Sequence, residues 1–232
     1  MVSPDASEPL RPPESLARKV PLVTVAVPIG ERDWKVTCVQ SQDALLDAAE
    51  SFAHFPYGFL LWESAVGLAR LLTARPELVA GKRVLELGAG AGLPGIVARF
   101  LGAEVWQTDH QPDALALARF NAAQNGVEGL QSFLADWYDW SHAARYDVLL
   151  GADILYQRDA YYHLERIFRQ NLAPDGKLLL SDPTRPQAME FAAHLEKSGW
   201  RIALETDRVL LEETGRESQP VEVALLLGTR RA

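Results

Sequence analysis

Short apolar segments alternate with amphipathic segments along most of this chain, and this alternation constrains the fold more than any other feature. The apolar segments are bounded by turn-forming residues and are typical of buried strands. In the amphipathic segments, Pro94 and Pro112 stand where a first helical turn accepts proline. Strands are expected at 83–87, 104–108, 130–134, 147–152, 177–181, 202–206 and 221–227, and helices at 94–101, 112–125, 159–171 and 187–198. Repeated β-then-α order predicts a mostly parallel sheet with helices on both faces.

The last two expected strands, 202–206 and 221–227, have no clear helix between them. Their connection includes the short polar stretch 212–220. Antiparallel strands can be joined by a short connection, whereas parallel strands need a crossover. We therefore expect a terminal antiparallel pair, and the fold class is α/β with a mostly parallel sheet whose last strand is antiparallel.

The sequence before residue 56 has a different character. Residues 1–18 are polar and rich in proline, so we expect a disordered or loosely docked tail, without the apolar segment of a secretory signal. Residues 19–55 are expected to form a hairpin-and-helix appendage, and residues 56–232 the main domain, which opens with a helix over 62–72. The appendage is expected to hold strands at 21–28 and 34–39, a turn at 29–32 and a helix at 43–53 with Ser41 as its N-cap. Whether the hairpin is a lid or a docking surface stays open.

The net charge, the counts of cysteine and histidine and the lengths of the apolar runs limit which partners and ligands this chain can bind. The 232 residues include 23 Lys and Arg against 31 Asp and Glu, a net charge of −8. The chain lacks the surface-wide basic field that binds nucleic acid, so no nucleic-acid partner is expected. A single cysteine, Cys38, excludes an internal disulfide and a multi-cysteine zinc site, and the five histidines lack metal-ligand spacing. No apolar run reaches the ~20 residues of a membrane span. We expect a soluble cytoplasmic protein without a metal, and a monomer is favoured.

A glycine-rich loop joins the first expected strand of the main domain to its helix. Glycines let a chain turn sharply and approach a ligand closely, and the helix start directs free N–H groups at the same place. The spacing is Glu86-x-Gly88-x-Gly90-x-Gly92, which differs from the G-x-G-x-x-G of dinucleotide-binding folds. An acid before the first glycine suits a cationic ligand better than a pyrophosphate. S-adenosylmethionine carries a sulfonium and an amino group and no phosphate. A tight turn without a ligand is the alternative.

Acidic residues follow the next two strands. Asp109 ends the second strand, about 20 residues past the glycines, where an acid can accept hydrogen bonds from ribose hydroxyls. Its alternative role is a helix cap before Pro112. Asp136 and Trp137 follow the third strand, where a carboxylate can bind an adenine amino group and a ring can cover the base. The alternative there is a surface aspartate beside a core tryptophan.

These motifs make the sequence similar to the class I, seven-strand S-adenosylmethionine-dependent methyltransferases. Within that class it resembles methyltransferase family 16, which contains many protein lysine methyltransferases. The family's Asp-x-x-Tyr motif is matched by Asp153-Ile-Leu-Tyr156 after the strand at 147–152, and its upstream tryptophan by Trp62. The resemblance spans residues 55–228 and implies a Rossmann-like seven-strand methyltransferase sheet.

The likeness extends to the electron-transfer-flavoprotein β-subunit lysine methyltransferases and their bacterial relatives. Those proteins carry an Asp-Pro-x-Arg element after the fifth strand, matched here by Asp182-Pro-Thr-Arg185. The resemblance implies that Asp182 and Arg185 bind the substrate, and a solvated loop arginine is the alternative. It also implies S-adenosyl-L-methionine as cofactor, held by Trp62, Glu86, Gly88, Gly90, Gly92, Asp109, Asp136, Trp137 and Ala152.

Methyl transfer from a sulfonium is an in-line displacement, so the enzyme has to align nucleophile, methyl and sulfur and exclude water. A lysine nucleophile must also lose its proton, and a desolvated pocket lowers its pKa. The resemblance implies that Asp153 orients the amine and that Tyr156 hydrogen-bonds it and walls the pocket. A turn cap and a core aromatic residue are their alternative roles.

The residues and the resemblance together leave three candidate functions. The first is a protein lysine N-methyltransferase, whose partner is a protein substrate. The second is an N-methyltransferase of a small nitrogenous substrate, such as a nicotinamide-like heterocycle or an amine. The third is a non-catalytic binding protein, against which the intact glycine loop and Asp109 argue. The methyl acceptor and the number of methyl groups transferred stay open.

Overall fold

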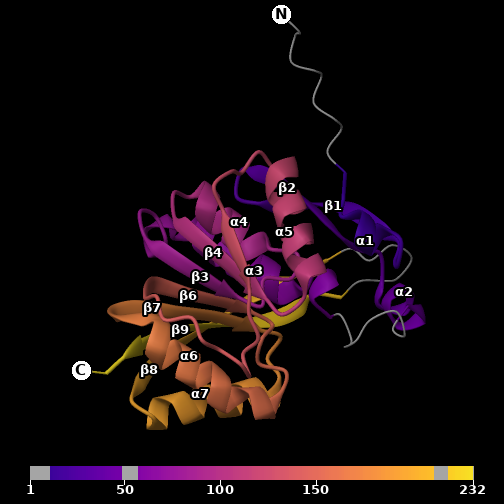
Figure 1. Ribbon diagram of the computed structural model, residues 1–232. Coiled ribbons are helices and arrows are strands. Elements are labelled where there is room, and N and C mark those ends of the chain that lie inside the picture. The colour runs from indigo at the N-terminus through magenta and orange to yellow at the C-terminus, as the bar shows by residue number, and fades with distance from the viewer. Residues whose placement is uncertain (1–10, 49–56, 212–218, 232) are drawn as a thin grey trace, which may run out of the picture.

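Seven strands form one sheet in the computed structural model (Figure 1), which describes residues 11–48, 57–211 and 219–231. The sheet order is β5-β4-β3-β6-β7-β9-β8, and β9 runs antiparallel to both of its neighbours while the other pairs are parallel. The strands are β3 (Arg83–Leu87), β4 (Glu104–Asp109), β5 (Gln131–Leu134), β6 (Tyr146–Ala152), β7 (Leu172–Asp182), β8 (Trp200–Val209) and β9 (Val221–Arg230). The expected α/β fold with a terminal antiparallel pair is confirmed.

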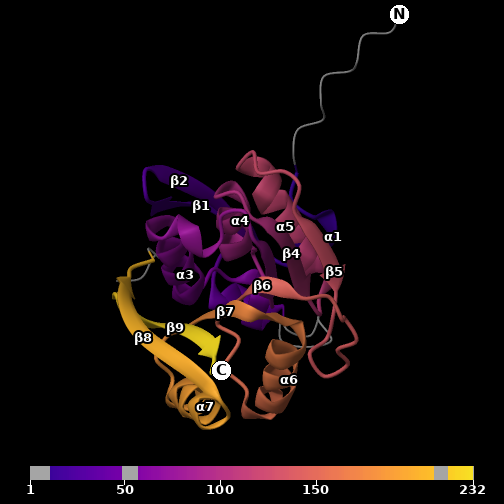
Figure 2. The same ribbon diagram turned by 90° about the vertical axis from the view of Figure 1, so that its left-hand side faces the viewer.

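Helices cover both faces of this sheet. Neighbouring residues of a strand point to opposite faces, and Val84 and Leu85 of β3 accordingly belong to two different apolar clusters. One cluster includes α3 (Glu63–Ala74), α4 (Leu93–Phe100) and α5 (Pro112–Gln124), and the other includes α6 (Tyr161–Asn171) and α7 (Pro186–Lys197). Figure 2 shows α6 and α7 together, apart from α3, α4 and α5. Burial on both faces explains why the strands read as nearly continuous apolar runs.

Some elements differ in length from the expectation. The helix expected at 159–171 begins as a 3-10 turn, η4 (Arg158–Ala160), before α6. Strands β8 and β9 pair over ten residues each, from Trp200↔Arg230 to Val209↔Val221, and are therefore longer than their apolar cores suggested. Two further 3-10 turns, η2 (Tyr57–Phe59) and η3 (Pro76–Leu78), flank α3.

The N-terminal segment packs on the sheet domain. It contains α1 (Glu14–Ala17), the antiparallel pair β1 (Leu22–Ile29) and β2 (Arg32–Val39), and α2 (Gln42–Asp47). The expected hairpin and the N-cap are present, since Ser41 Oγ accepts a hydrogen bond from the N–H of Ala44 at 3.1 Å. Helix α2 ends at Asp47, earlier than the expected residue 53, and residues 49–53 lie outside the described residues.

The tail expected over residues 1–18 docks on the domain where the structure describes it. Leu16 is 0% exposed and joins the apolar cluster on the α3–α5 side. Ser15 Oγ donates to Asp113 Oδ1 at 2.6 Å and Lys19 Nζ to Asp113 Oδ2 at 3.0 Å. One buried leucine with two polar contacts therefore holds residues 14–19, and of the two expected states, disordered or loosely docked, the described part of the tail is docked. Residues 1–10 lie outside the described part.

No described helix is both long and apolar enough to cross a bilayer. Within the described part of the chain, no group of three or more His, Cys, Asp and Glu side chains is arranged to hold a metal ion.

Candidate active site

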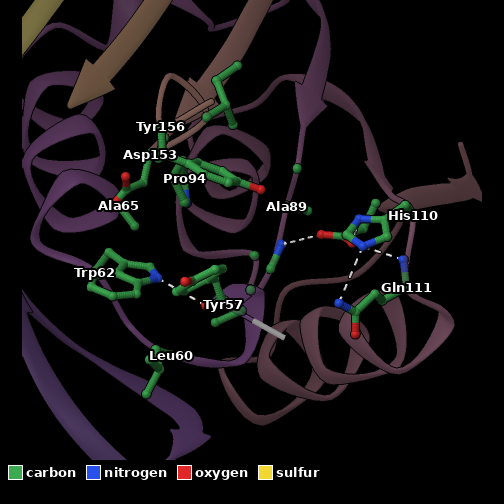
Figure 3. A pocket seen from close by; sticks show the side chains of 18 of the residues that line it. Tyr57, Leu60, Trp62, Ala65, Ala89, Pro94, His110, Gln111, Asp153 and Tyr156 are labelled. Carbon is green, nitrogen blue, oxygen red and sulfur yellow. Dashed lines mark hydrogen bonds and ion pairs between the residues drawn. The ribbon is translucent and has the colours of Figure 1, made fainter. Parts of the chain in front are cut away.

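A cavity of about 390 Å³ lies at the carboxyl ends of β3, β4, β5 and β6 (Figure 3). The strand order reverses between β3 and β6, and ligands of open α/β sheets bind at such a switch point. Segment η2 and the start of α3 complete the lining. The predicted site residues that line the cavity are Trp62, Gly88, Gly90, Gly92, Asp109, Asp136, Trp137, Ala152, Asp153 and Tyr156. Glu86, Asp182 and Arg185 are not among the lining residues.

The three loop glycines all have left-handed backbones. The φ angles of Gly88, Gly90 and Gly92 are 62°, 52° and 84°. A Cβ at Gly90 would lie 2.6 Å from the carbonyl oxygen of Gly58, and one at Gly92 would lie 2.7 Å from Ala118 Cβ. Packing within the protein therefore already requires glycine at these positions, so the glycines alone do not identify a ligand.

Glu86 lies beneath the glycine loop. It is 1% exposed, and its Oε1 accepts from the Gly95 N–H at 3.2 Å while its Oε2 accepts from Gln107 Nε2 at 2.7 Å. Gln107 Nε2 also donates to the Gly92 carbonyl at 3.0 Å. Burial raises the pKa of Glu86 to about 7, against the lowering effect of both hydrogen bonds. Sequence reasoning expected Glu86 to face a cationic ligand, whereas its oxygens brace the loop from inside.

Asp109 combines a turn contact with a place in the cavity wall. Its Oδ2 accepts from the Gly90 N–H and its Oδ1 from the Gln111 N–H, both at 3.0 Å. Gln111 is the N-cap residue of α5, so Asp109 stabilises the start of that helix. Burial raises the pKa of Asp109, and the two N–H donors counteract this. Oδ1 also lies 3.4 Å from His110 Nδ1, whereas Oδ2 has a further lone pair for a ligand hydroxyl.

Asp136 and Trp137 form the wall beyond β5. Asp136 is exposed, and its Oδ1 accepts from the Tyr138 N–H at 2.9 Å. The Trp137 ring lies against Gly88, since a Cβ there would be 3.0 Å from Trp137 Cζ2. The cavity thus has an indole beside the first loop glycine.

Asp153 is held by Arg185, which lies outside the cavity lining. Asp153 follows β6 with a φ of 58°, and its N–H donates to the Ser181 carbonyl at 2.9 Å. Arg185 Nη1 pairs with Asp153 Oδ1 and also donates to Asp182 Oδ2 at 2.9 Å. The Arg185 N–H donates to Asp182 Oδ1 at 2.7 Å. Asp182 and Arg185, which are expected to bind substrate, form an ion-pair network with Asp153 in this structure.

The second carboxylate oxygen of Asp153, Oδ2, differs from Oδ1 in its hydrogen bonding. Oδ2 is buried and has no hydrogen-bond partner among the described residues, although Asp153 lines the cavity and its side chain is 8% exposed. A buried acceptor without a donor costs about 1–3 kcal/mol.

Three aromatic rings stand in the same wall (Figure 3). Trp62 Nε1 donates to the Tyr57 carbonyl at 3.0 Å, and the Tyr57 ring lies 6.5 Å from the Trp62 ring and 5.9 Å from the Tyr156 ring. Burial, with the nearby carboxylates of Asp109 and Asp153, raises the pKa of Tyr156 to about 12. Tyr156 therefore keeps its proton near neutral pH and can donate a hydrogen bond.

Comparison with known proteins agrees with this geometry. A family model described as lysine methyltransferase matches residues 40–198. The chain belongs to this lysine methyltransferase family. It is 37% identical over 129 residues to the protein N-lysine methyltransferase METTL21A of Danio rerio, an alignment that covers 53% of this chain and 59% of that relative. It is 30% identical over 142 residues to the electron transfer flavoprotein beta subunit lysine methyltransferase of Rattus norvegicus, covering 60% and 54%.

A solved structure supports the fold of this lysine methyltransferase family member. The ribosomal protein L11 methylase of Lactobacillus delbrueckii subsp. bulgaricus superposes with a TM-score of 0.52 and 22% identity, over 71% of this chain and 78% of that one. At this identity the likeness concerns the fold alone. The chain spans less than two thirds of the length of both curated relatives named above.

Several lining residues of this family member were not predicted from sequence. They come from η2 and from the turns after β4 and β5, and include Tyr57, Gly58, His110, Gln111 and Tyr138. Tyr57 and Gly58 stand in the stretch that contains Trp62, so the upstream tryptophan was the available signal. His110 and Gln111 directly follow Asp109, and their contact with the cavity depends on the turn that Asp109 stabilises.

Proposed function

We propose that this chain is an S-adenosylmethionine-dependent N-methyltransferase that methylates lysine side chains of a protein substrate. The observation that carries the proposal is the buried Asp153 Oδ2, which lacks a donor among the described residues and stands in a wall with aromatic rings. A lysine amine supplies N–H groups for this oxygen. Its methylene chain suits a passage lined by Tyr57 and Tyr156.

The charge of the cavity supports a cationic cofactor. Its described lining contains the carboxylates of Asp109, Asp136 and Asp153 and no lysine or arginine. A pyrophosphate would meet these acids without a countercharge, whereas a sulfonium and an ammonium would be attracted. The volume of about 390 Å³ falls in the range of small-molecule sites, roughly 300–1,000 Å³. The residues present therefore fit S-adenosylmethionine.

Each group of residues has a proposed task in holding the cofactor. Asp109 would accept hydrogen bonds from the ribose hydroxyls, and Asp136 with Trp137 would bind the adenine. Trp62, Ala152 and the glycine loop would form the remaining wall. Bound there, S-adenosylmethionine would supply a methyl group on a sulfonium leaving group.

The acceptor amine has to arrive neutral and aligned. Burial disfavours its charged form, which lowers its pKa. Asp153 Oδ2 would accept one N–H and so fix the direction of the nitrogen lone pair. Tyr156, protonated at neutral pH, would close the wall against water. Positioning of this kind is the main task of an enzyme in a displacement that needs no covalent intermediate.

A small heterocyclic acceptor fits these residues less well. A nicotinamide-like ring nitrogen carries no N–H, so Asp153 Oδ2 could accept only from the carboxamide and would not orient the methylated nitrogen itself. A small amine would satisfy that oxygen and is therefore the remaining rival acceptor.

Transfer of a labelled methyl group distinguishes these acceptors. The full chain is incubated with radiolabelled S-adenosylmethionine and a cell lysate, and proteins are separated on a gel and hydrolysed to amino acids. We expect labelled protein that yields methylated lysine, and no label when Asp153→Asn replaces the wild type. Label confined to small molecules would contradict the protein substrate, and label in neither fraction would contradict methyl transfer.

A further inference from the structure

We propose that Arg185 is a positioning residue for methyl transfer, which fixes Asp153 through Oδ1 and leaves Oδ2 for the acceptor amine. The inference rests on the proposed function and deepens it. This role differs from the expected contact of Arg185 with the substrate, and Arg185 is not among the residues that line the cavity.

The contacts form a clamp between two neighbouring strands. Asp153 follows β6 and Asp182 ends β7, and a single nitrogen, Arg185 Nη1, reaches one oxygen of each carboxylate. Asp182 is 0% exposed, and its other oxygen accepts the Arg185 N–H at 2.7 Å. Asp182 thus fixes both the backbone and the guanidinium of Arg185. Arg185 in turn occupies one oxygen of Asp153 and not the other.

The backbone on both sides of the clamp is held in an uncommon conformation. Asp153 and Thr184 are the non-glycine residues of the described chain with positive φ, at 58° and 57°. A left-handed backbone is unfavourable for a β-branched residue such as threonine. Such conformations persist where the surroundings fix them, and they cluster at functional sites. The Thr184 N–H donates to the Asp182 carbonyl at 2.7 Å, so this tight turn directs Arg185 toward Asp153.

Charge balance agrees with the geometry. Burial raises the pKa of both Asp153 and Asp182, and Arg185 lowers both. Without the guanidinium, two buried carboxylates would face each other, and Asp153 would lose its fixed orientation together with its countercharge.

Replacement of Arg185 would give one result if it formed only a structural ion pair and another if it were a positioning residue. The former would affect stability and leave the chemistry of the folded enzyme unchanged. The latter would slow the transfer step in protein that is folded and binds the methyl donor normally, because the contact aligns the transition state.

The test compares Arg185→Met and Arg185→Lys with the matched control Arg158→Met. Arg158 also links the region after β6 to α7, through a pair with Glu190 at 2.7 Å, but that pair is 65% and 61% exposed. Methyl transfer to a lysine substrate identified with the wild type is measured together with melting and binding of S-adenosylhomocysteine. We expect kcat to fall roughly 10- to 100-fold in Arg185→Met, with donor affinity unchanged within about twofold. Arg185→Lys should restore part of kcat, and Arg158→Met should equal the wild type.

A double variant shows whether Arg185 acts through Asp153. If it does, Asp153→Asn combined with Arg185→Met transfers methyl no more slowly than Asp153→Asn alone. Multiplied losses would overturn the inference, as would a wild-type kcat in folded Arg185→Met. If Arg185→Met does not fold, Arg185→Lys decides: a reduced kcat at normal donor affinity supports the role, and an unchanged kcat overturns it. A wild type that labels no protein would refute the proposed function itself, and this inference with it.

Discussion

Asn121 in α5 hydrogen-bonds to both backbone groups of Thr37 in β2, a residue 84 positions earlier. Its Oδ1 accepts from the Thr37 N–H at 2.8 Å, and its Nδ2 donates to the Thr37 carbonyl at 3.0 Å. The same Nδ2 donates to the carbonyl of Ala91 in the glycine loop at 2.8 Å. One fully buried side chain therefore ties the hairpin to the loop that lines the cavity. No residue of 21–39 lines the cavity, and the hairpin supports the glycine loop from behind.

Replacement of Asn121 by leucine should destabilise the fold. The backbone groups of Thr37 and the Ala91 carbonyl would lose partners in a buried place, and each such loss costs about 1–3 kcal/mol. With three groups affected, we expect the free energy of unfolding to fall by at least about 3 kcal/mol, measured by urea denaturation. Arg119→Ala, on an exposed part of the same helix, should change it by no more than about 0.5 kcal/mol. Equal effects of the two variants would contradict the role of Asn121.

Asp109→Ala should weaken cofactor binding. Loss of a charged acceptor for the ribose should raise the Kd for S-adenosylhomocysteine roughly 10- to 150-fold in calorimetric titration. Asp113→Ala is the control, because Asp113 is an acid of the same helix region that pairs with Lys19 and does not line the cavity. An unchanged Kd in folded Asp109→Ala would show that Asp109 only stabilises the turn before α5 and does not bind the cofactor.

The stability of the glycine loop should depend on pH through Glu86. Its pKa in the folded protein is about 7, above its usual 4.5, so the native state binds the proton more tightly than the unfolded state. The contribution of Glu86 is therefore fully present below about pH 4.5 and is lost as pH rises through 7. Denaturation at several pH values should show unfolding free energy decreasing over this window relative to Glu86→Gln. Parallel curves for the two proteins would contradict the raised pKa.

Tyr156→Phe should be milder than any change at Asp153. The variant keeps the ring that packs 5.9 Å from Tyr57 and removes only the hydroxyl. We expect kcat to fall several-fold, on the order of one lost neutral hydrogen bond of about 0.5–1.5 kcal/mol. Tyr156→Ala, which also opens the wall to water, should lose more. Steady-state methylation assays compare the two, and equal rates would show that the ring has no part in the wall.

Much of the fold followed from local pattern. The strands that end in Leu87 and Ala152 are apolar on both faces and bounded by turn residues, so periodicity located them. The motif residues Gly88, Asp109 and Asp153 follow strand ends, and a parallel sheet brings such ends to one edge.

Other features depend on contacts between residues distant in sequence. Glu86 lies between Leu85 and Leu87 in β3, so its side chain points to the opposite face of the sheet, toward α4. There Gln107 of the neighbouring strand donates a hydrogen bond to it. The direction of Arg185 depends on the left-handed turn at Thr184, and nothing in the local sequence predicts positive φ for a threonine. The docking of Leu16 depends on a surface that exists only after the sheet and its helices have packed.

The central claim is that Asp153 orients the acceptor amine during methyl transfer, and single-turnover transfer by Asp153→Asn tests it most directly. Asparagine tolerates the left-handed backbone at φ 58° and keeps an oxygen for Arg185, so the fold should persist. We predict that the transfer rate falls by roughly 100-fold or more, while the Kd for S-adenosylhomocysteine and the melting temperature stay near their wild-type values. Transfer at the wild-type rate by folded Asp153→Asn would contradict the account.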